Sequence, residues 1–326
     1  MKIGGTSPTA PDHERMPLSP RAPCTDRSAS WPWEAAARTV ASAIVRHGEL
    51  LTVVQGDVTD RQAVEDVIEA GCDAIILGAA ITADAARDAA DPESVLRVNL
   101  LAHLPILAAA RRCRVARIVN LSSAAAYGDA GARHKLLDEE TPCDPVSLYA
   151  ITKFASEKVA ARLAALWRTD VISVRLSAVF GPWERETGVR DTLSPQAQIM
   201  AALGRRREAV LPRPGIRDWI YAPDVAEALA VLIEATVPKH RLYNISTGLE
   251  WTALQWGQDL AALHPGFVCR LAEPGETPTI DLHGPADRTP LSVARLEEEF
   301  GWRARFGRAA SAADLSAWWT QHREGR

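Results

Sequence analysis

Short apolar runs recur along the chain at intervals that leave room for a helix between them. They lie at residues 51–55, 74–77, 117–121 and 171–176. Runs of this length with little polar alternation predict strands that are buried on both faces. Such strands separated by helical segments predict an α/β fold built on a doubly wound parallel sheet, with a smaller C-terminal region.

The segments between these runs carry the signals of helix ends. Thr59 and Gln62 have the spacing of a capping box, which predicts a helix that extends to Ala70. A longer helix is predicted from Pro92 to about Arg112, with a kink at its internal proline. Further helices are predicted over 35–47, over 149–167, over 225–235 with Asp224 as the N-cap, over 292–300, and around Leu315, Trp318 and Trp319.

The regularity of the pattern divides the chain into regions. Residues 1–34 contain six prolines among Ser, Thr and Arg and show no helical or strand period, so they are predicted to form an irregular leader. Residues 35–182 are predicted to form one nucleotide-binding type of α/β domain, to which the segment 217–248 returns. Residues 183–216 and 249–326 are predicted to form the smaller region that binds substrate.

Composition excludes several classes of partner. The formal net charge of −4 and scattered basic residues give no sign of a nucleic-acid partner. No apolar run reaches the length of a membrane span, so no membrane partner is predicted. The histidines and cysteines lack ligand spacing, and no metal site is predicted. The five cysteines are odd in number and widely spread, which predicts reduced thiols in a cytoplasmic protein; they are Cys24, Cys72, Cys113, Cys143 and Cys269.

Tyr149 and Lys153 are the most informative pair in the sequence. They stand four residues apart in a predicted helix, so their side chains lie on one face. A fixed ammonium beside a phenol favours the phenolate and lowers the pKa of the tyrosine. With a serine hydroxyl nearby, the phenol can act as a general acid or base while a hydride moves elsewhere. The alternative is a surface pair on an ordinary helix.

The segment around this pair resembles the extended short-chain dehydrogenase/reductase family, which includes NAD-dependent nucleotide-sugar epimerases and dehydratases. The resemblance rests on Ser122-Ser123-x-x-x-Tyr127-Gly128 followed by Tyr149-x-x-x-Lys153. It implies a Rossmann-like fold, NAD as cofactor with NADP as an alternative, and a catalytic triad of Ser123, Tyr149 and Lys153. The cofactor-binding positions that it implies are Asp57, Val58, Leu77, Ala79, Ala80, Asn99, Ser122, Tyr149, Lys153 and Val179.

Two arginines are predicted to bind substrate through the same resemblance. The segment from Arg217 to Ala226 resembles the family's Arg-Asp-Phe-x-x-x-x-Asp-Val-Ala, in which the arginine holds the diphosphate of a nucleotide sugar. Ser123 and Arg288 complete the predicted substrate contacts. The alternative for Arg217 is a structural surface pair with Asp218, and the sequence favours neither interpretation. The substrate is expected to be a small molecule, a sugar or nucleotide sugar.

Several alternatives stay open at this stage. The glycine-rich turn that opens the family's first βαβ unit is absent, so the resemblance begins near residue 35 and the first unit is degenerate or missing. A remodelled leader, a truncated derivative of an active enzyme, or a non-catalytic relative with a relic triad all fit. Ala124 and Ala125 stand where family dehydratases carry an Asp-Glu pair, which disfavours dehydration. Epimerase and simple dehydrogenase remain equal alternatives, and a homodimer is a hypothesis.

Overall fold

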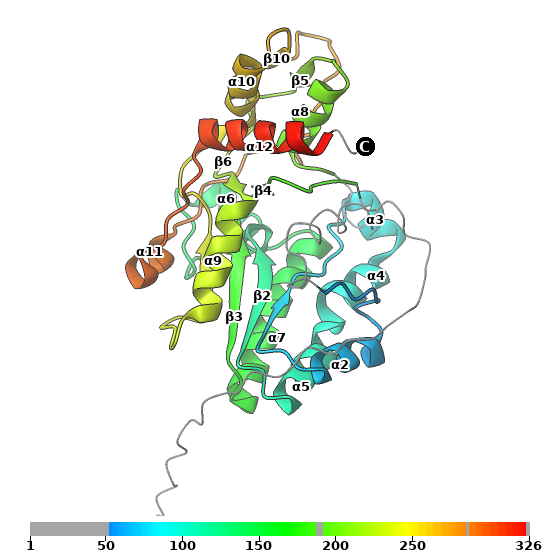
Figure 1. Cartoon of the computed structure of the whole chain (residues 1–326), viewed down its shortest axis with the longest axis vertical. Coiled ribbons are helices and arrows are strands. Elements are labelled where there is room, and N and C mark those ends of the chain that lie inside the picture. The colour runs from blue at the N-terminus through cyan, green and yellow to red at the C-terminus, as the bar shows by residue number, and fades with distance from the viewer. Residues whose placement is uncertain (1–51, 187–191, 285–286, 324–326) are drawn as a thin grey trace, which may run out of the picture. The chain divides into compact units, whose positions relative to one another are not determined.

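The computed structural model describes residues 52–186, 192–284 and 287–323, all within one compact unit. Its centre is a parallel sheet of four strands in the order β1-β2-β3-β8 (Figure 1). These strands are β1 (Ala74–Leu77), β2 (Arg117–Ser123), β3 (Val171–Leu176) and β8 (Leu242–Ile245). The predicted leader 1–34 and the predicted helix 35–47 lie outside the described residues.

Both faces of the sheet are covered by helices, as the apolar runs predicted. Val119 and Ile172 pack on one face against α9 (Ala222–Glu234). Ile118 and Val171 pack on the other face in a cluster with residues of three helices, which are α2 (Arg61–Glu69), α5 (His103–Arg112) and α7 (Leu148–Trp167). Neighbouring residues of one strand point to opposite faces, so strands enclosed on both sides need apolar residues at successive positions.

The carboxyl ends of three strands meet at one edge of the sheet. Ser123 at the end of β2 is level with Leu176 at the end of β3, and Leu176 is level with Ile245 at the end of β8. Ligands of open parallel sheets bind outside this edge. The loops that follow β2, β3 and β8 are therefore the place where the predicted site residues should meet.

The segment 92–112 contains three helical pieces. They are α4 (Pro92–Leu96), the π-helical turn η2 (Arg97–Leu101) and α5. Pro105 has no N–H, and its ring would clash with the carbonyl of residue 101 in a regular helix, which explains why the wide turn lies directly before it. The predicted kink is therefore a π-turn.

By length and mean hydropathy (1.2), Pro92–Arg112 would suit a membrane span. However, 44% of its apolar window is buried inside the structure, and it packs against α2 and α7. One side of this segment therefore packs on other helices of the α/β fold.

Three local predictions were wrong. Residues 52–55 form no strand. The N-cap of α2 is Asp60, which accepts from the N–H groups of Gln62 and Ala63, whereas the Thr59 hydroxyl donates to Asp57. Asp224 does not cap α9, which begins at Ala222; its carboxylate accepts from the backbone N–H groups of Arg305 and Phe306 at 2.9 and 3.1 Å.

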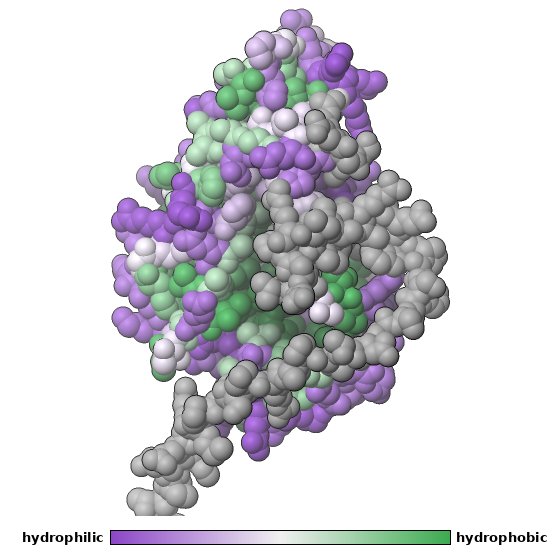
Figure 2. Space-filling view, in the orientation of Figure 1, coloured by the Kyte–Doolittle hydropathy of each residue, from purple (hydrophilic) through white to green (hydrophobic). Residues whose placement is uncertain are grey.

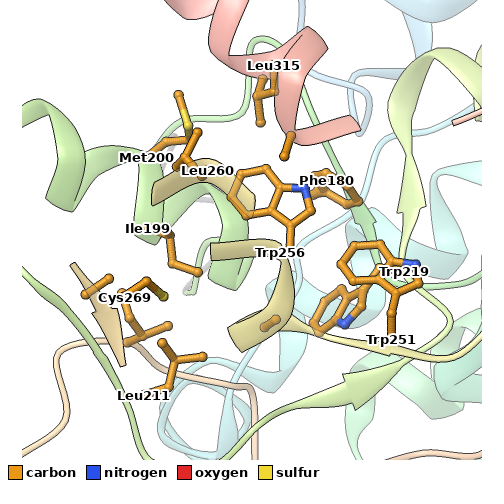
Figure 3. Packing of buried hydrophobic residues seen from close by; sticks show 14 of the residues in the cluster. Phe180, Ile199, Met200, Leu211, Trp219, Trp251, Trp256, Leu260, Cys269 and Leu315 are labelled. Carbon is orange, nitrogen blue, oxygen red and sulfur yellow. The ribbon is translucent and has the colours of Figure 1, made fainter. Parts of the chain in front are cut away.

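A separate apolar cluster gathers buried residues between Phe180 and Tyr221 and between Trp251 and Leu315 (Figure 3). Trp256 and Phe180 meet edge to face with ring centroids 5.7 Å apart, and Trp219 and Trp251 lie beside them. These tryptophans are buried core residues. The elements around them are α8 (Pro195–Gly204), β5 (Ala209–Leu211), α10 (Ala253–Leu263), β10 (Cys269–Leu271) and α12 (Arg308–Arg323).

Short elements complete the described chain. They are α3 (Ala85–Ala90), η3 (Ala124–Tyr127), α6 (Ala130–Arg133), β4 (Val179–Phe180), β6 (Ile216–Arg217), β7 (Ile220–Tyr221), β9 (Trp251–Thr252) and α11 (Ala294–Phe300).

Apolar side chains are exposed on the outer strand β1 and in the segment before α2. Ile76 on β1 is 45% exposed, and Val53 and Val54 are exposed as well. Figure 2 shows apolar side chains gathered in the middle of one face, between hydrophilic margins. Within the described residues β1 pairs with β2 alone, so this end of the sheet carries more apolar surface than a covered edge would.

Candidate functional site

Tyr149 and Lys153 occupy successive turns at the start of α7, which packs on β2. Ser147 caps this helix by accepting from the Ala150 N–H at 3.2 Å. Lys153 Nζ donates to the Leu121 carbonyl at 2.8 Å and lies 5.9 Å from the centre of the Tyr149 ring. The cap, the helix and this bond to β2 together hold the ammonium beside the phenol at the carboxyl edge of the sheet.

Ser123 is the last residue of β2 and begins the turn η3. Its Oγ accepts from the Ala125 N–H at 3.1 Å, which fixes the side chain while leaving its hydroxyl hydrogen to donate elsewhere. Ser123 is partly exposed. A hydroxyl held in this way can donate to a substrate oxygen.

Ser122 differs from its neighbour because its side chain is internal. Its hydroxyl donates to Glu157 of α7, and Glu157 also binds the Arg175 guanidinium in two bonds of 2.9 and 2.7 Å. All three side chains are buried, and the Arg175 guanidinium lies 4.5 Å from the centre of the Tyr127 ring. The Ser122 side chain therefore joins β2 to α7, and only its backbone could serve the predicted cofactor contact.

Asn99 is also a positioning residue by its contacts. Its amide accepts from the Ile81 N–H at 2.7 Å and donates to the Ile81 carbonyl at 2.9 Å and to Thr152 at 3.2 Å. The side chain is fully buried. Asn99 thus ties the loop after β1 to α7, the helix of Tyr149 and Lys153, and holds that loop in place for a ligand.

The other predicted cofactor positions fall into two groups. Ala79 and Ala80 follow β1 and are at least partly accessible, and the same is true of Asp57, Val58 and Val179. Asp57 is held by two bonds of 2.8 Å from Thr59, and these bonds lower the pKa of its carboxyl. Leu77 instead lies in the core of the sheet, so its side chain packs and does not face a ligand.

Arg217 and Arg288 belong to a cluster of charged side chains near the ends of β3 and β8. Asp218 accepts there from Arg288 (2.7 Å), from the hydroxyls of Ser177 and Ser246, and from the Leu291 N–H. Ser177 and Ser246 directly follow β3 and β8. Asp218 is completely buried and pairs with Arg288, so the alternative of a surface pair between Arg217 and Asp218 is wrong.

Arg217 itself makes few bonds. Its guanidinium donates to the His283 carbonyl at 3.5 Å and lies 5.7 Å from the centre of the Trp219 ring. Burial lowers the pKa of Arg217 to about 10, with a further lowering by the charge of Arg288. A guanidinium in this position is suited to bind an anionic ligand.

Two buried basic side chains, Lys153 and His103, interact electrostatically. Burial lowers the pKa of Lys153 to about 8. Burial and, second, the charge of Lys153 lower the pKa of His103 to about 4, so His103 is neutral at physiological pH. A neutral imidazole leaves Lys153 as the positive charge beside Tyr149.

Sequence reasoning missed several members of this arrangement. Glu157, Arg175 and His103 lie in segments whose apolar period gave only a helix or a strand. Arg213 and Asp287 lie in segments without a clear period, and their pairing, 3.0 Å between Arg213 Nη2 and Asp287 Oδ1, spans more than seventy residues. Only the tertiary structure brings these side chains together.

No predicted site residue lines the cavity between α8 and α12. This cavity of about 310 Å³ lies between α8 and α12 and is lined by Met200, Leu315, Trp318 and other residues. Within the described part of the chain, no three His, Cys, Asp or Glu side chains come close enough to hold a metal ion.

Comparison with known proteins identifies a family that this chain matches. Residues 26–246 match the model of the NAD dependent epimerase/dehydratase family, about two thirds of the chain. The match begins at residue 26, slightly before residue 35, where the sequence resemblance was expected to start. It ends at residue 246, so residues 247–326 are not matched.

Curated relatives are more distant. A dTDP-glucose 4,6-dehydratase of Streptomyces niveus is 26% identical over 271 residues, which are 83% of this chain and 76% of that protein. A dTDP-D-glucose 4,6-dehydratase of Bos taurus is 26% identical over 212 residues, 64% of this chain and 57% of that protein.

Solved structures share the fold. A UDP-N-acetylglucosamine 4-epimerase from Methanobrevibacter ruminantium superposes with a TM-score of 0.69 at 20% identity, covering 84% of each chain. A UDP-glucuronic acid 4-epimerase from Bacillus cereus has a TM-score of 0.69 at 14% identity and covers 87% of this chain and 86% of its own. These likenesses establish a Rossmann-type α/β architecture.

Proposed function

The chain belongs to the NAD-dependent epimerase/dehydratase family, and we propose that it is an NAD(P)-dependent enzyme that oxidises a hydroxyl of a nucleotide sugar. The observation that carries the proposal is the placement of Lys153 and Tyr149 on one face of α7, with Ser123 at the end of the adjacent strand. In this proposal residues 183–216 and 249–326 bind the substrate.

The residues after β1 and on α7 fit the nicotinamide half of NAD. The loop 78–80 contains only Gly and Ala, so a flat ring can lie close to the backbone. Lys153 Nζ has three hydrogens and uses one on Leu121, so others can bind ribose hydroxyls. When bound, the cofactor supplies the hydride acceptor. The Bacillus cereus epimerase structure contains NAD, and that of an enzyme called RMD from Pseudomonas aeruginosa contains NADPH.

The chain's own residues then handle the proton. Tyr149 Oη takes the proton of the substrate hydroxyl, and the Lys153 ammonium stabilises the phenolate that must be present beforehand. Ser123 Oγ donates to the reacting oxygen and holds it against Tyr149. Asn99 and the bond from Lys153 to Leu121 keep the participating loops in register.

Sugar dehydration is disfavoured, although the curated relatives above are named dehydratases. Elimination of water needs an acid and a base beside the Ser-Tyr pair. Ala124 and Ala125 follow Ser123 in η3, and a methyl group transfers no proton. The proposed reaction is therefore oxidation of a hydroxyl, either completed as a dehydrogenase or reversed on the opposite face as an epimerase.

Cofactor binding by the purified chain is the test. Denaturation should release NAD(H) if the enzyme is an epimerase that keeps its cofactor, and a fluorescence titration with NADH should saturate if it is a dehydrogenase. Lys153→Met should weaken NADH binding at least tenfold, while the control Lys158→Met, one turn and a half farther along α7, should bind as the wild type does. A folded chain that binds no cofactor would instead be a non-catalytic relative.

The catalytic role of Tyr149 has its own experiment. Tyr149→Phe removes the oxygen that is proposed to accept the substrate proton, so the turnover of nucleotide sugars should fall by a factor of about 10² to 10⁴ with NADH affinity unchanged. The epimerase and dehydrogenase alternatives separate in the same assay, because only the dehydrogenase accumulates reduced cofactor in proportion to product.

We also propose a homodimer. Apolar side chains remain exposed on the helix that carries Tyr149 and on the helical segment 92–112 before it, and they are Leu96, Leu101, Leu104 and Ile151. Light scattering should report twice the mass of one chain, and Leu101→Lys should return it to the monomer. The free thiols of the described cysteines, which are Cys72, Cys113, Cys143 and Cys269, are compatible with the proposed cytoplasmic location.

A further inference from the structure

Charge is unbalanced in the cluster that contains the two predicted substrate arginines. Arg213, Arg217 and Arg288 face Asp218 and Asp287, so three positive charges meet two negative charges. The charge of Asp218 is neutralised by Arg288, because the buried carboxylate of Asp218 already accepts from four donors that include Arg288. Asp287 alone then stands against Arg213 and Arg217.

Arg213 is poorly satisfied in this arrangement. Its Nη2 lies 3.0 Å from Asp287 Oδ1, yet its buried Nε and Nη2 groups have no well-directed hydrogen-bond acceptor among the described residues. The Arg213 side chain is 23% exposed and that of Asp287 is 30% exposed. Arg217, four residues away, donates one long bond to a carbonyl of the described residues. Half-buried guanidinium groups that lack acceptors are costly unless an anion supplies them.

We propose that Arg213 is a third anion-binding arginine of the substrate site, and that Asp287 holds it only until the diphosphate of a nucleotide sugar arrives. This inference rests on the proposed function, in which Arg217 and Arg288 bind that diphosphate. The resting contact between Arg213 and Asp287 is a charge pair that a phosphate can replace without loss of charge balance. A diphosphate brings at least two negative charges and several oxygen acceptors in fixed geometry, which suit planar guanidinium groups.

The two members of the pair should have opposite effects on binding. Arg213 attracts the diphosphate, so its loss weakens binding. Asp287 competes for Arg213 and repels the diphosphate, so its loss strengthens binding. A pair with a purely structural role predicts instead that either loss weakens binding, because either one leaves the partner uncompensated.

Calorimetric titration with UDP distinguishes these cases. In the presence of NAD, Arg213→Gln should lower UDP affinity about tenfold or more, and Asp287→Asn should raise it several-fold. Arg213→Lys, which keeps the charge but not the planar fork, should fall between Arg213→Gln and the wild type. Arg207→Gln is the control. Arg207 is exposed and precedes Arg213 in the sequence, and its loss should leave UDP affinity unchanged. Circular dichroism checks that each variant is folded.

The contrary outcomes separate the inference from the function beneath it. If Arg217→Gln weakens UDP binding but Arg213→Gln binds like the wild type, the role of Arg213 is refuted and the proposed substrate class stands. If Asp287→Asn weakens binding as much as Arg213→Gln, the pair is structural and the inference also fails. If the wild type binds no UDP while NADH binds, the nucleotide-sugar assignment fails, and the role of Arg213 falls with it.

Discussion

Buried charged side chains in this chain form hydrogen bonds and ion pairs with residues of other helices and strands. Glu157 of α7 accepts from Arg175 of β3 and from Ser122 of β2, and both carboxylate and guanidinium are almost wholly inaccessible. In such a pair, loss of one partner leaves the other charged and unpaired in a medium of low polarity.

The first prediction concerns this pair. Glu157→Leu should lower the free energy of unfolding by about 3–5 kcal/mol, because Arg175 would keep its charge without an acceptor. Urea unfolding followed by circular dichroism measures the change. Glu93→Leu is the control, since its pair with Arg97 is exposed and 4.0 Å long, and it should change stability by less than about 1 kcal/mol. Equal losses in the two variants would contradict the argument.

His103 gives a prediction about pH. Its pKa is lowered to about 4 in the folded chain, first by burial and then by the charge of Lys153. The unfolded chain therefore takes up this proton at higher pH than the folded one, and stability that is present above pH 6.5 is lost as the pH falls toward 4. The loss is on the order of 3 kcal/mol at most.

His103→Leu should remove that part of the pH dependence. Thermal melts at several pH values between 4 and 7 measure it, and the slope of stability against pH in this interval should be smaller than in the wild type. His134→Leu, at an exposed histidine, should keep the slope of the wild type. A His103→Leu protein with an unchanged slope would show that another group titrates here.

At the scale of elements, the π-turn η2 sets the position of Asn99. The turn widens the helix directly before Pro105, and Asn99 within it binds both backbone groups of Ile81. A proline constraint in one helix thus fixes the loop after a neighbouring strand. Loop 79–81 carries residues of the proposed cofactor site, so helix geometry and ligand binding are linked.

Asn99→Ala should separate this role from general packing. It removes three hydrogen bonds of a buried amide, so the free energy of unfolding should fall by about 1–3 kcal/mol and the affinity for NADH should fall with it. Asn120→Ala removes buried bonds to Ser156 of α7 and Ser173 of β3, neither of which belongs to the loop, and it should reduce stability with NADH affinity preserved. NADH fluorescence titration and urea unfolding provide the two readings.

Element boundaries were predictable where a local signal was strong. The strands 74–77 and 171–176 were predicted with their observed bounds because short, mostly apolar runs between helical segments are typical of buried strands. The start of α2 was misplaced by one residue, because Thr59 is used by Asp57 and the next aspartate becomes the cap. Competing caps of similar strength are decided by the fold around them.

At the scale of the molecule, α10 and β10 approach each other closely at Gly257. A Cβ on Gly257 would lie 2.2 Å from Cys269 Sγ, and this contact joins the helix to the strand inside the cluster of Figure 3. Close approach of two elements at this point needs a residue without a side chain.

Gly257→Ala should therefore destabilise the chain by about 1–3 kcal/mol through overpacking. The double variant Gly257→Ala/Cys269→Ala should recover part of the loss, because the sulfur that clashes is removed. Gly307→Ala, where a Cβ meets nothing within 4 Å, should be tolerated. Thermal unfolding checks all three, and a double variant less stable than the sum of the single changes would argue against a direct clash.

The sequence by itself determined the alternation of strands and helices, the parallel sheet and the Tyr149–Lys153 pair, because these depend on local periods and on spacing within one helix. Only the tertiary structure decided which serine is internal, which aspartate neutralises Arg288, and that Arg213 and Asp287 meet. Those facts depend on contacts between residues far apart in the chain. The free energy of burying each charge depends on those partners, and local sequence carries no record of them.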